Sequence, residues 1–145
     1  MLNISKSSSN ILFFVDSDNS ADLIPKYIIP FLETNEGGHV LSYACQSVRT
    51  HLFPKYQHPP LNIFATLMPG PGSGKNAVDT ILARDLGILH ILCKIDVIFF
   101  IISRDKFDLS EVWFGLDQKR IFHFADNIRI LLNLLNNIKR LNKNY

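Results

Sequence analysis

The run IDVIFFIIS at positions 95–103 constrains the fold more than any other part of the sequence. It is almost continuously apolar and rich in β-branched and aromatic residues, which is typical of a strand buried on both faces. The run ILFFV at 11–15 has the same character. Strands of this kind occur in parallel sheets whose two sides are covered by helices. We therefore expect an α/β protein.

Other segments of the chain extend this pattern. Further strand-like runs occupy 39–44, 61–67 and 120–124. Helix-like spacing of apolar residues is found from Ser20 to the glycines at 37 and 38, and at 46–56, 77–92, 109–116 and 126–141. Because helical segments and no hairpin signals separate the strands, the chain is expected to form βαβ units. The prediction is a three-layer α/β/α fold with a five-stranded parallel sheet in the order 3-2-1-4-5.

Length and composition indicate one globular domain. The chain has 145 residues, of which 47% are hydrophobic and 19% charged, which is typical of one domain. We expect a single domain at 10–145, preceded by a flexible tail at 1–9. No apolar run has the length of a signal peptide or of a membrane-spanning helix. The only two cysteines, Cys45 and Cys93, favour a reducing compartment over a disulfide framework or a zinc site. We expect a cytoplasmic protein.

Aspartates follow the two strands that are expected to be neighbours at the centre of the sheet. Asp16 and Asp18 follow the first strand, and Asp105 and Asp108 follow the fourth. In the order 3-2-1-4-5 these strands flank the point where strand order reverses, and ligands of open α/β sheets bind beyond the carboxyl ends of the strands at that point. Asp79 opens the helix that leads into the fourth strand and is expected to overlook the same edge.

Carboxylates gathered in this way repel one another unless a cation neutralises them. Oxygen ligands suit Mg²⁺ or Mn²⁺, which activates water or binds phosphodiester oxygens during hydrolysis. Local roles remain open for each residue taken alone. The pairs Asn76–Asp79 and Asp108–Glu111 have capping-box spacing, and Asp16 is placed to begin a turn. Their gathering at one sheet edge favours the metal site.

Three blocks of sequence carry a resemblance to a known group of proteins. They are VDSDNS at 15–20, SGKNAVD at 73–79 and ISRDKFD at 102–108. Together they resemble the PIN-like and NYN superfamily of metal-dependent ribonucleases, with the blocks in the family's order over most of the chain. The resemblance implies a parallel α/β fold, a bound Mg²⁺ or Mn²⁺ and RNA as the substrate.

Carried over position by position, the resemblance implies two sets of site residues. The metal ligands and catalytic acids would be Asp16, Asp79, Asp105 and Asp108. Residues that would meet the substrate or orient those acids are Asp18, Asn19, Lys75, Asn76, Ser103, Arg104 and Lys106. The third block lacks the family's glycine before its phenylalanine, so Asp108 lies one residue nearer to Asp105 than in the family pattern. Asp18 stands where the family often has Glu.

The chain is thus predicted to be a metal-dependent endoribonuclease. The alternative is a catalytically degenerate PIN-like module that binds RNA or a protein partner. A third interpretation concerns PGPGSGKN at 69–76, which looks like a phosphate-binding loop. It is disfavoured because Pro69 replaces the first glycine of that motif and Asn76 replaces its hydroxyl residue.

The remaining charged residues carry weaker predictions. Cations that would attract RNA, or simply form a solvated surface, are Lys26, Lys75, Arg104, Lys106 and Lys119. The acids Asp22, Glu33, Asp85 and Asp117 are expected on solvated helix faces. The apolar stripe of the last helix is expected to dock on the core, with homodimer formation as the second interpretation.

Overall fold

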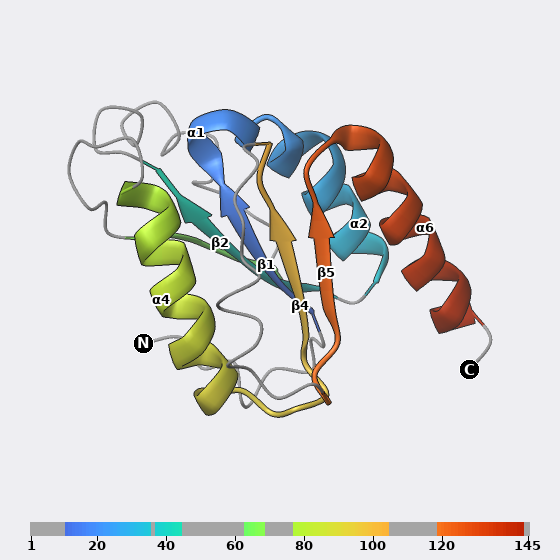
Figure 1. Ribbon diagram of the computed structural model, residues 1–145. Coiled ribbons are helices and arrows are strands. Elements are labelled where there is room, and N and C mark those ends of the chain that lie inside the picture. Colours follow the sequence, from blue (N-terminus) through green and yellow to red (C-terminus); the bar gives the residue numbers. More distant parts are fainter. Residues whose placement is uncertain (1–10, 36, 45–62, 69–76, 105–118, 144–145) are drawn as a thin grey trace.

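The computed structural model describes residues 11–35, 37–44, 63–68, 77–104 and 119–143. These residues form an all-parallel sheet in the order β3-β2-β1-β4-β5 (Figure 1), which confirms the predicted fold class and strand order. The strands are β1 (Ile11–Asp16), β2 (Gly38–Tyr43), β3 (Ile63–Leu67), β4 (Ile98–Ile102) and β5 (Phe122–Ala125). The helices are α1 (Ser17–Ser20), the π-helical segment η2 (Ile24–Ile28), α2 (Ile29–Thr34), α4 (Ala77–Leu92) and α6 (Ile128–Lys143).

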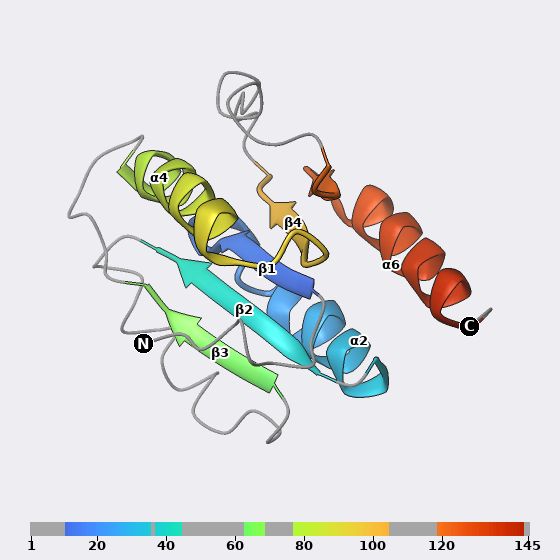
Figure 2. The ribbon, with the colours of Figure 1, turned by 90° about the horizontal axis from the view of Figure 1, so that it is seen from below.

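Helices cover both faces of the sheet (Figures 1 and 2). Alternate residues of β1 point to opposite faces, so Phe13 packs with η2, α2 and α6, whereas Phe14 packs with α4. Both phenylalanines also contact β4. Phe13 stacks on Phe100 with ring centroids 5.0 Å apart, and the Phe14 and Phe99 centroids are 5.1 Å apart. Full burial of each such ring stabilises the fold by about 1.5–3 kcal/mol. A continuously apolar strand gains this stabilisation on both of its faces, and a sheet covered by helices on both sides provides it.

The last helix docks on the core as predicted. In α6 the residues Leu131, Leu135 and Ile138 recur at helical spacing and are buried against the face formed by Phe13. The helix begins at Ile128, two residues later than predicted, because the Asn127 side-chain oxygen accepts a hydrogen bond from the backbone N–H of Ile130 at 2.9 Å. That contact is an N-cap, which places the start of the helix after Asn127.

The helix predicted from Ser20 is interrupted by a turn at residues 21–22 and then continues from η2 directly into α2. Pro25 and Pro30 each stand near the start of a helical segment, η2 and α2 respectively. Proline lacks the N–H that regular α-helical hydrogen bonding needs, and in this region the Ile29 N–H bonds to the Ile24 carbonyl five residues back. Helix α2 ends at Thr34, and Gly37 beyond it has a φ of 97° and donates its N–H to the Leu32 carbonyl at 2.7 Å. Glycine adopts this left-handed conformation without strain.

The first residues of the fourth and fifth strands differ from their predictions by more than one position. The fourth strand begins at Ile98 and not at residue 95, because residues 95–97 form a turn in which Val97 N–H bonds to the Lys94 carbonyl at 3.1 Å. The fifth strand spans Phe122–Ala125 and not 120–124, since Arg120 turns its side chain into the protein before the strand begins. The predicted helices at 46–56 and 109–116 lie outside the described residues.

Candidate functional site

The carboxyl ends of β1 and β4 lie side by side where the strand order reverses. Val15 pairs with Ile102 in this part of the sheet, so the next residues, Asp16 and Ser103, come together beyond them. The Ser103 hydroxyl donates a hydrogen bond to Asp16 Oδ2 at 3.0 Å, and both side chains are buried, with 2% and 1% of their surfaces exposed. Two residues that the sequence placed in one site are therefore in direct contact.

The Asp16 carboxylate is not used as a helix cap. Asp16 occupies the N-cap position of α1 in extended conformation, yet its side chain makes no capping hydrogen bond. The interpretation of Asp16 as a residue that only begins a turn therefore lacks the contact that such a role provides. Burial of a carboxylate is unfavourable, so its retention at this edge needs another explanation.

Small hydroxyl side chains surround this edge, and sequence reasoning identified only one of them. Ser17 and Ser42 are buried, and their Oγ atoms lie 2.5 Å apart. Ser17 follows β1, Ser42 lies near the end of β2 and Ser103 follows β4. In the sequence, these buried serines could have been found by looking for a serine at or after the carboxyl end of an otherwise apolar strand. Hydroxyl groups consequently stand at the carboxyl ends of three neighbouring strands.

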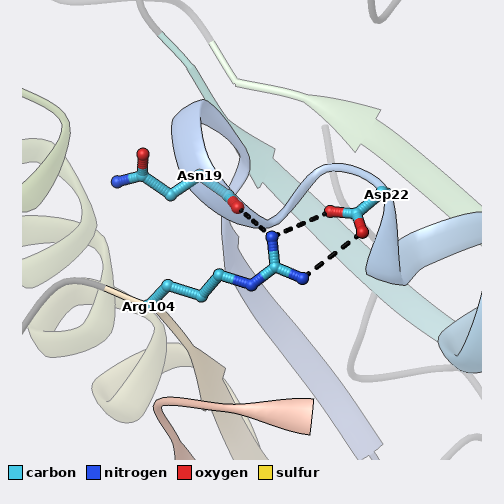
Figure 3. A network of polar contacts seen from close by, with 3 residues as sticks. All are labelled: Asn19, Asp22 and Arg104. Atoms are coloured by element: carbon cyan, nitrogen blue, oxygen red, sulfur yellow. Dashed lines mark hydrogen bonds and ion pairs between the residues drawn. The ribbon is translucent and has the colours of Figure 1, made fainter.

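Arg104 ties the end of β4 to the segment after β1 (Figure 3). Its guanidinium donates to the Asn19 carbonyl at 2.7 Å and to the two Asp22 carboxylate oxygens at 3.2 and 3.3 Å. The Asn19 side chain is directed away from this group in Figure 3. Asp22 is therefore an ion-pair partner and does not simply lie on a solvated face. The arrangement gives Arg104 a role in positioning the turn beside Asp16; its expected contact with substrate stays a prediction.

Asp79 and Asp18 are the other described acids of the predicted site. Asp79 lies in the first turn of α4, and this end of the helix reaches the carboxyl edge of the sheet (Figure 1). Asp18 lies in α1, and both residues are half-buried. The structure thus places Asp79 on the helix end that faces the predicted edge.

The metal cluster is only partly covered by the structure. Within the described ranges, no three His, Cys, Asp or Glu side chains form a group able to hold a metal ion. The predicted ligands Asp105 and Asp108 lie outside these ranges, as do Lys75, Asn76 and Lys106. The described part of the predicted set therefore consists of Asp16 and Asp79.

A buried polar pair between β2 and α4 corrects one prediction. Asp85 was expected on a solvated face, but only 6% of it is exposed, and it accepts a hydrogen bond from the Tyr43 hydroxyl at 3.0 Å. Burial and the Asp85 charge raise the pKa of Tyr43, so its phenol is held in the donating form. The signal was present in the sequence, because Asp85 falls between Leu82 and Leu86 on the sheet-facing stripe.

Lys119 does not belong to the predicted edge. It precedes Arg120 and β5, and so lies at the amino-terminal edge of a parallel sheet, opposite Asp16. Lys119 therefore lies away from the acidic site, and its expected attraction for RNA stays a prediction. Lys26 is exposed on η2.

No protein-family model matches this chain, and searches of curated proteins and of solved structures return no significant match. Among the residues described, no helix is long and apolar enough to span a bilayer.

Proposed function

We propose that the protein is a metal-dependent endoribonuclease whose acidic centre lies beyond the carboxyl ends of β1 and β4. One observation carries the proposal. Asp16 is buried at the point where strand order reverses, it accepts a hydrogen bond from Ser103 of the neighbouring chain segment, and it does not cap α1. Open α/β sheets bind their ligands at this point.

The donor atoms at this edge suit a hard divalent cation. Asp16 and Asp79 supply carboxylate oxygens, and Asp105 and Asp108 follow β4 in the sequence and would complete an oxygen-only set. Mg²⁺ and Mn²⁺ prefer such ligands, and when bound they activate water and polarise phosphoryl oxygens. The Ser103 hydroxyl would fix the orientation of the Asp16 carboxylate, which is the usual task of a hydrogen bond behind a metal ligand.

RNA is proposed as the substrate because the three sequence blocks resemble metal-dependent ribonucleases. The residues proposed to meet its phosphates are Lys75, Asn76, Arg104 and Lys106, and Asp18 and Asn19 would support the acidic group. Among these, Arg104 is already bound to Asp22 and Asn19, so it would hold the turn next to the acids while its remaining surface faces solvent. A cytoplasmic location belongs to the same proposal and rests on the use of only two cysteines.

The proposal is tested with labelled single-stranded RNA, hairpin RNA and DNA of the same sequence, each incubated with the full chain and Mg²⁺ or Mn²⁺. We expect RNA cleavage that EDTA abolishes and that Asp16→Asn lowers at least about 100-fold, since a metal ligand supplies several kcal/mol of transition-state stabilisation. Asp96→Asn is the matched control, because Asp96 is an exposed acid in the turn before β4 at the opposite edge.

Three outcomes separate the hypotheses. Cleavage that survives EDTA or Asp16→Asn would refute the metal-dependent mechanism. Preferential cleavage of DNA would retain the mechanism and change the substrate. RNA binding with neither cleavage nor metal binding would support the catalytically degenerate module, which the shortened spacing between Asp105 and Asp108 also suggests.

A further inference from the structure

The position of α4 determines where Asp79 lies, and the inference that follows rests on the proposed function. Along most of its sheet-facing side α4 is held by apolar residues such as Val78, Leu82 and Leu86. Apolar contacts are non-directional, so they allow a helix to slide or rotate at small cost. A polar contact with defined geometry is what fixes such a helix in one register.

Tyr43 and Asp85 form such a contact inside this apolar layer. The Tyr43 hydroxyl donates to Asp85 Oδ2 at 3.0 Å, and Arg84 Nε donates to Asp85 Oδ1 at 3.1 Å. Only 2% of Tyr43 is exposed, and its ring stacks on Phe14 of β1. Both oxygens of this buried carboxylate are therefore engaged, one of them by a side chain that the sheet holds rigidly.

The pair connects the two described acids of the proposed site. Tyr43 is paired in register with Asp16 on the adjacent strand, about 4.8 Å away across the sheet. Asp85 is on the same helix as Asp79, six residues later, which corresponds to about 9 Å along the helix axis. The Tyr43–Asp85 hydrogen bond thus links β2, which lies beside the strand of Asp16, to the helix that carries Asp79.

We propose that Tyr43 and Asp85 are positioning residues that set the distance and orientation of Asp79 relative to Asp16. If the pair served stability alone, two apolar side chains of similar volume would serve as well, because burying an ion or a polar group rarely stabilises more than good apolar packing does. The double variant Tyr43→Phe with Asp85→Leu therefore separates the two roles. It keeps the layer packed and removes this directional contact, while the bonds from Arg120 to His90 near the far end of α4 remain.

The experiment is a calorimetric Mn²⁺ titration of the full chain, run beside thermal unfolding of the same samples. For the double variant we expect a melting temperature at or above that of the wild type and an Mn²⁺ affinity about 10–100-fold weaker, as for other residues that orient metal ligands indirectly. Asp85→Asn retains an acceptor for the Tyr43 hydroxyl and is expected to bind Mn²⁺ within about threefold of the wild type.

Ile138→Ala provides the stability control, because Ile138 is buried on the other face of the sheet. It should lower the melting temperature and leave Mn²⁺ affinity unchanged. Wild-type affinity in the double variant would overturn the positioning role while leaving the proposed function intact. Failure of the wild type to bind Mn²⁺ would instead overturn the proposed function itself. If the double variant does not fold, Tyr43→Phe alone removes the donor and is judged by the same affinity criterion.

Discussion

In the described part of the chain, the two edges of the sheet each bury one charged side chain, and the surroundings of these two charges differ. Asp16 lies at the carboxyl edge with 2% of its surface exposed, and Arg120 lies at the amino-terminal edge with 3% exposed. Equal burial therefore does not imply an equal role. The difference lies in what surrounds each charge.

Arg120 is surrounded by structural acceptors. Its side chain donates hydrogen bonds to the carbonyls of His90, Cys93, Lys94 and Val97 and to His90 Nδ1, at distances between 2.7 and 3.0 Å. These five bonds use all five N–H groups of a guanidinium. Three of the carbonyls belong to the end of α4 or the residues just after it, so Arg120 binds the negative end of the helix dipole. No donor is left to engage a ligand.

Asp16 instead is held by a hydroxyl and stands among serines at the edge where parallel sheets bind ligands. The role of a buried charge is best interpreted from the groups that surround it. A charge that joins chain segments through every available bond stabilises the fold. A charge placed at the strand-order reversal, beside small polar side chains, is the better candidate for chemistry.

The largest expected effect on stability comes from a substitution at the amino-terminal edge of the sheet. Arg120→Met should lower the free energy of unfolding by about 3–5 kcal/mol, because it removes five hydrogen bonds and leaves buried carbonyls without donors. Urea denaturation followed by circular dichroism measures the change. Lys119→Met, an exposed neighbour, should change the free energy by no more than about 0.5 kcal/mol. A loss below about 1 kcal/mol in Arg120→Met would show that the five contacts are not structural.

Asp16→Asn should raise the free energy of unfolding, whereas Arg120→Met should lower it. The amide keeps the size of the side chain and an acceptor for Ser103, and it removes a buried negative charge. We expect the free energy of unfolding to rise by about 0.5–2 kcal/mol, as is common when a functional charge is neutralised. The same urea titration detects this rise. A loss of more than about 2 kcal/mol would make Asp16 a structural residue like Arg120.

Ser103→Ala should lower the free energy of unfolding less than Arg120→Met does. It should weaken Mn²⁺ binding more than it lowers stability. Loss of one buried hydrogen bond lowers the free energy of unfolding by about 1 kcal/mol. Because the hydroxyl would orient Asp16, Mn²⁺ affinity should fall about tenfold. Ser42→Ala is the matched control, as Ser42 contacts Ser17 and not Asp16. Equal affinity losses in both variants would argue against a specific role for Ser103.

Asp22→Asn should give the smallest effect on stability. Its ion pair with Arg104 joins side chains that are 43% and 36% exposed, respectively, and such pairs contribute about 0–1 kcal/mol. The contribution of this ion pair to stability should shrink as the NaCl concentration is raised, because salt screens exposed charges. Thermal unfolding of both proteins at low and high salt tests this expectation. A difference that does not depend on salt would point to a contact other than the ion pair.

Much of the sheet could be predicted from the sequence because strands that are buried on both faces appear there as continuous apolar runs. Continuous apolar runs located β1 and β4, and the residues that end them placed Asp16 beside Ser103. Asp85 was misjudged although its position on the apolar stripe of α4 is visible in the sequence. Its burial depends on Tyr43, which comes from a strand 42 residues away.

Arg120 could not have been recognised from the sequence. A single arginine before a strand carries no periodic pattern, and its acceptors are main-chain carbonyls whose convergence exists only after α4, β4 and β5 have packed. The π-helical hydrogen bonding of η2 is not visible in the sequence for a different reason. The apolar spacing continues past Pro25 and Pro30, so periodicity alone does not reveal a change in hydrogen bonding.

The most direct test of the account is an NMR titration of the isotope-labelled full chain with substoichiometric Mn²⁺, whose unpaired electrons broaden nearby amide signals. The sheet is about five residues long, so its two edges are separated by about 17 Å. We expect early broadening at Asp18, Asp79 and Arg104, with Gly38, Ile98 and Phe122 affected last, and loss of this pattern in Asp16→Asn. Broadening centred on the amino-terminal edge, or none at either edge, would contradict the proposed metal site.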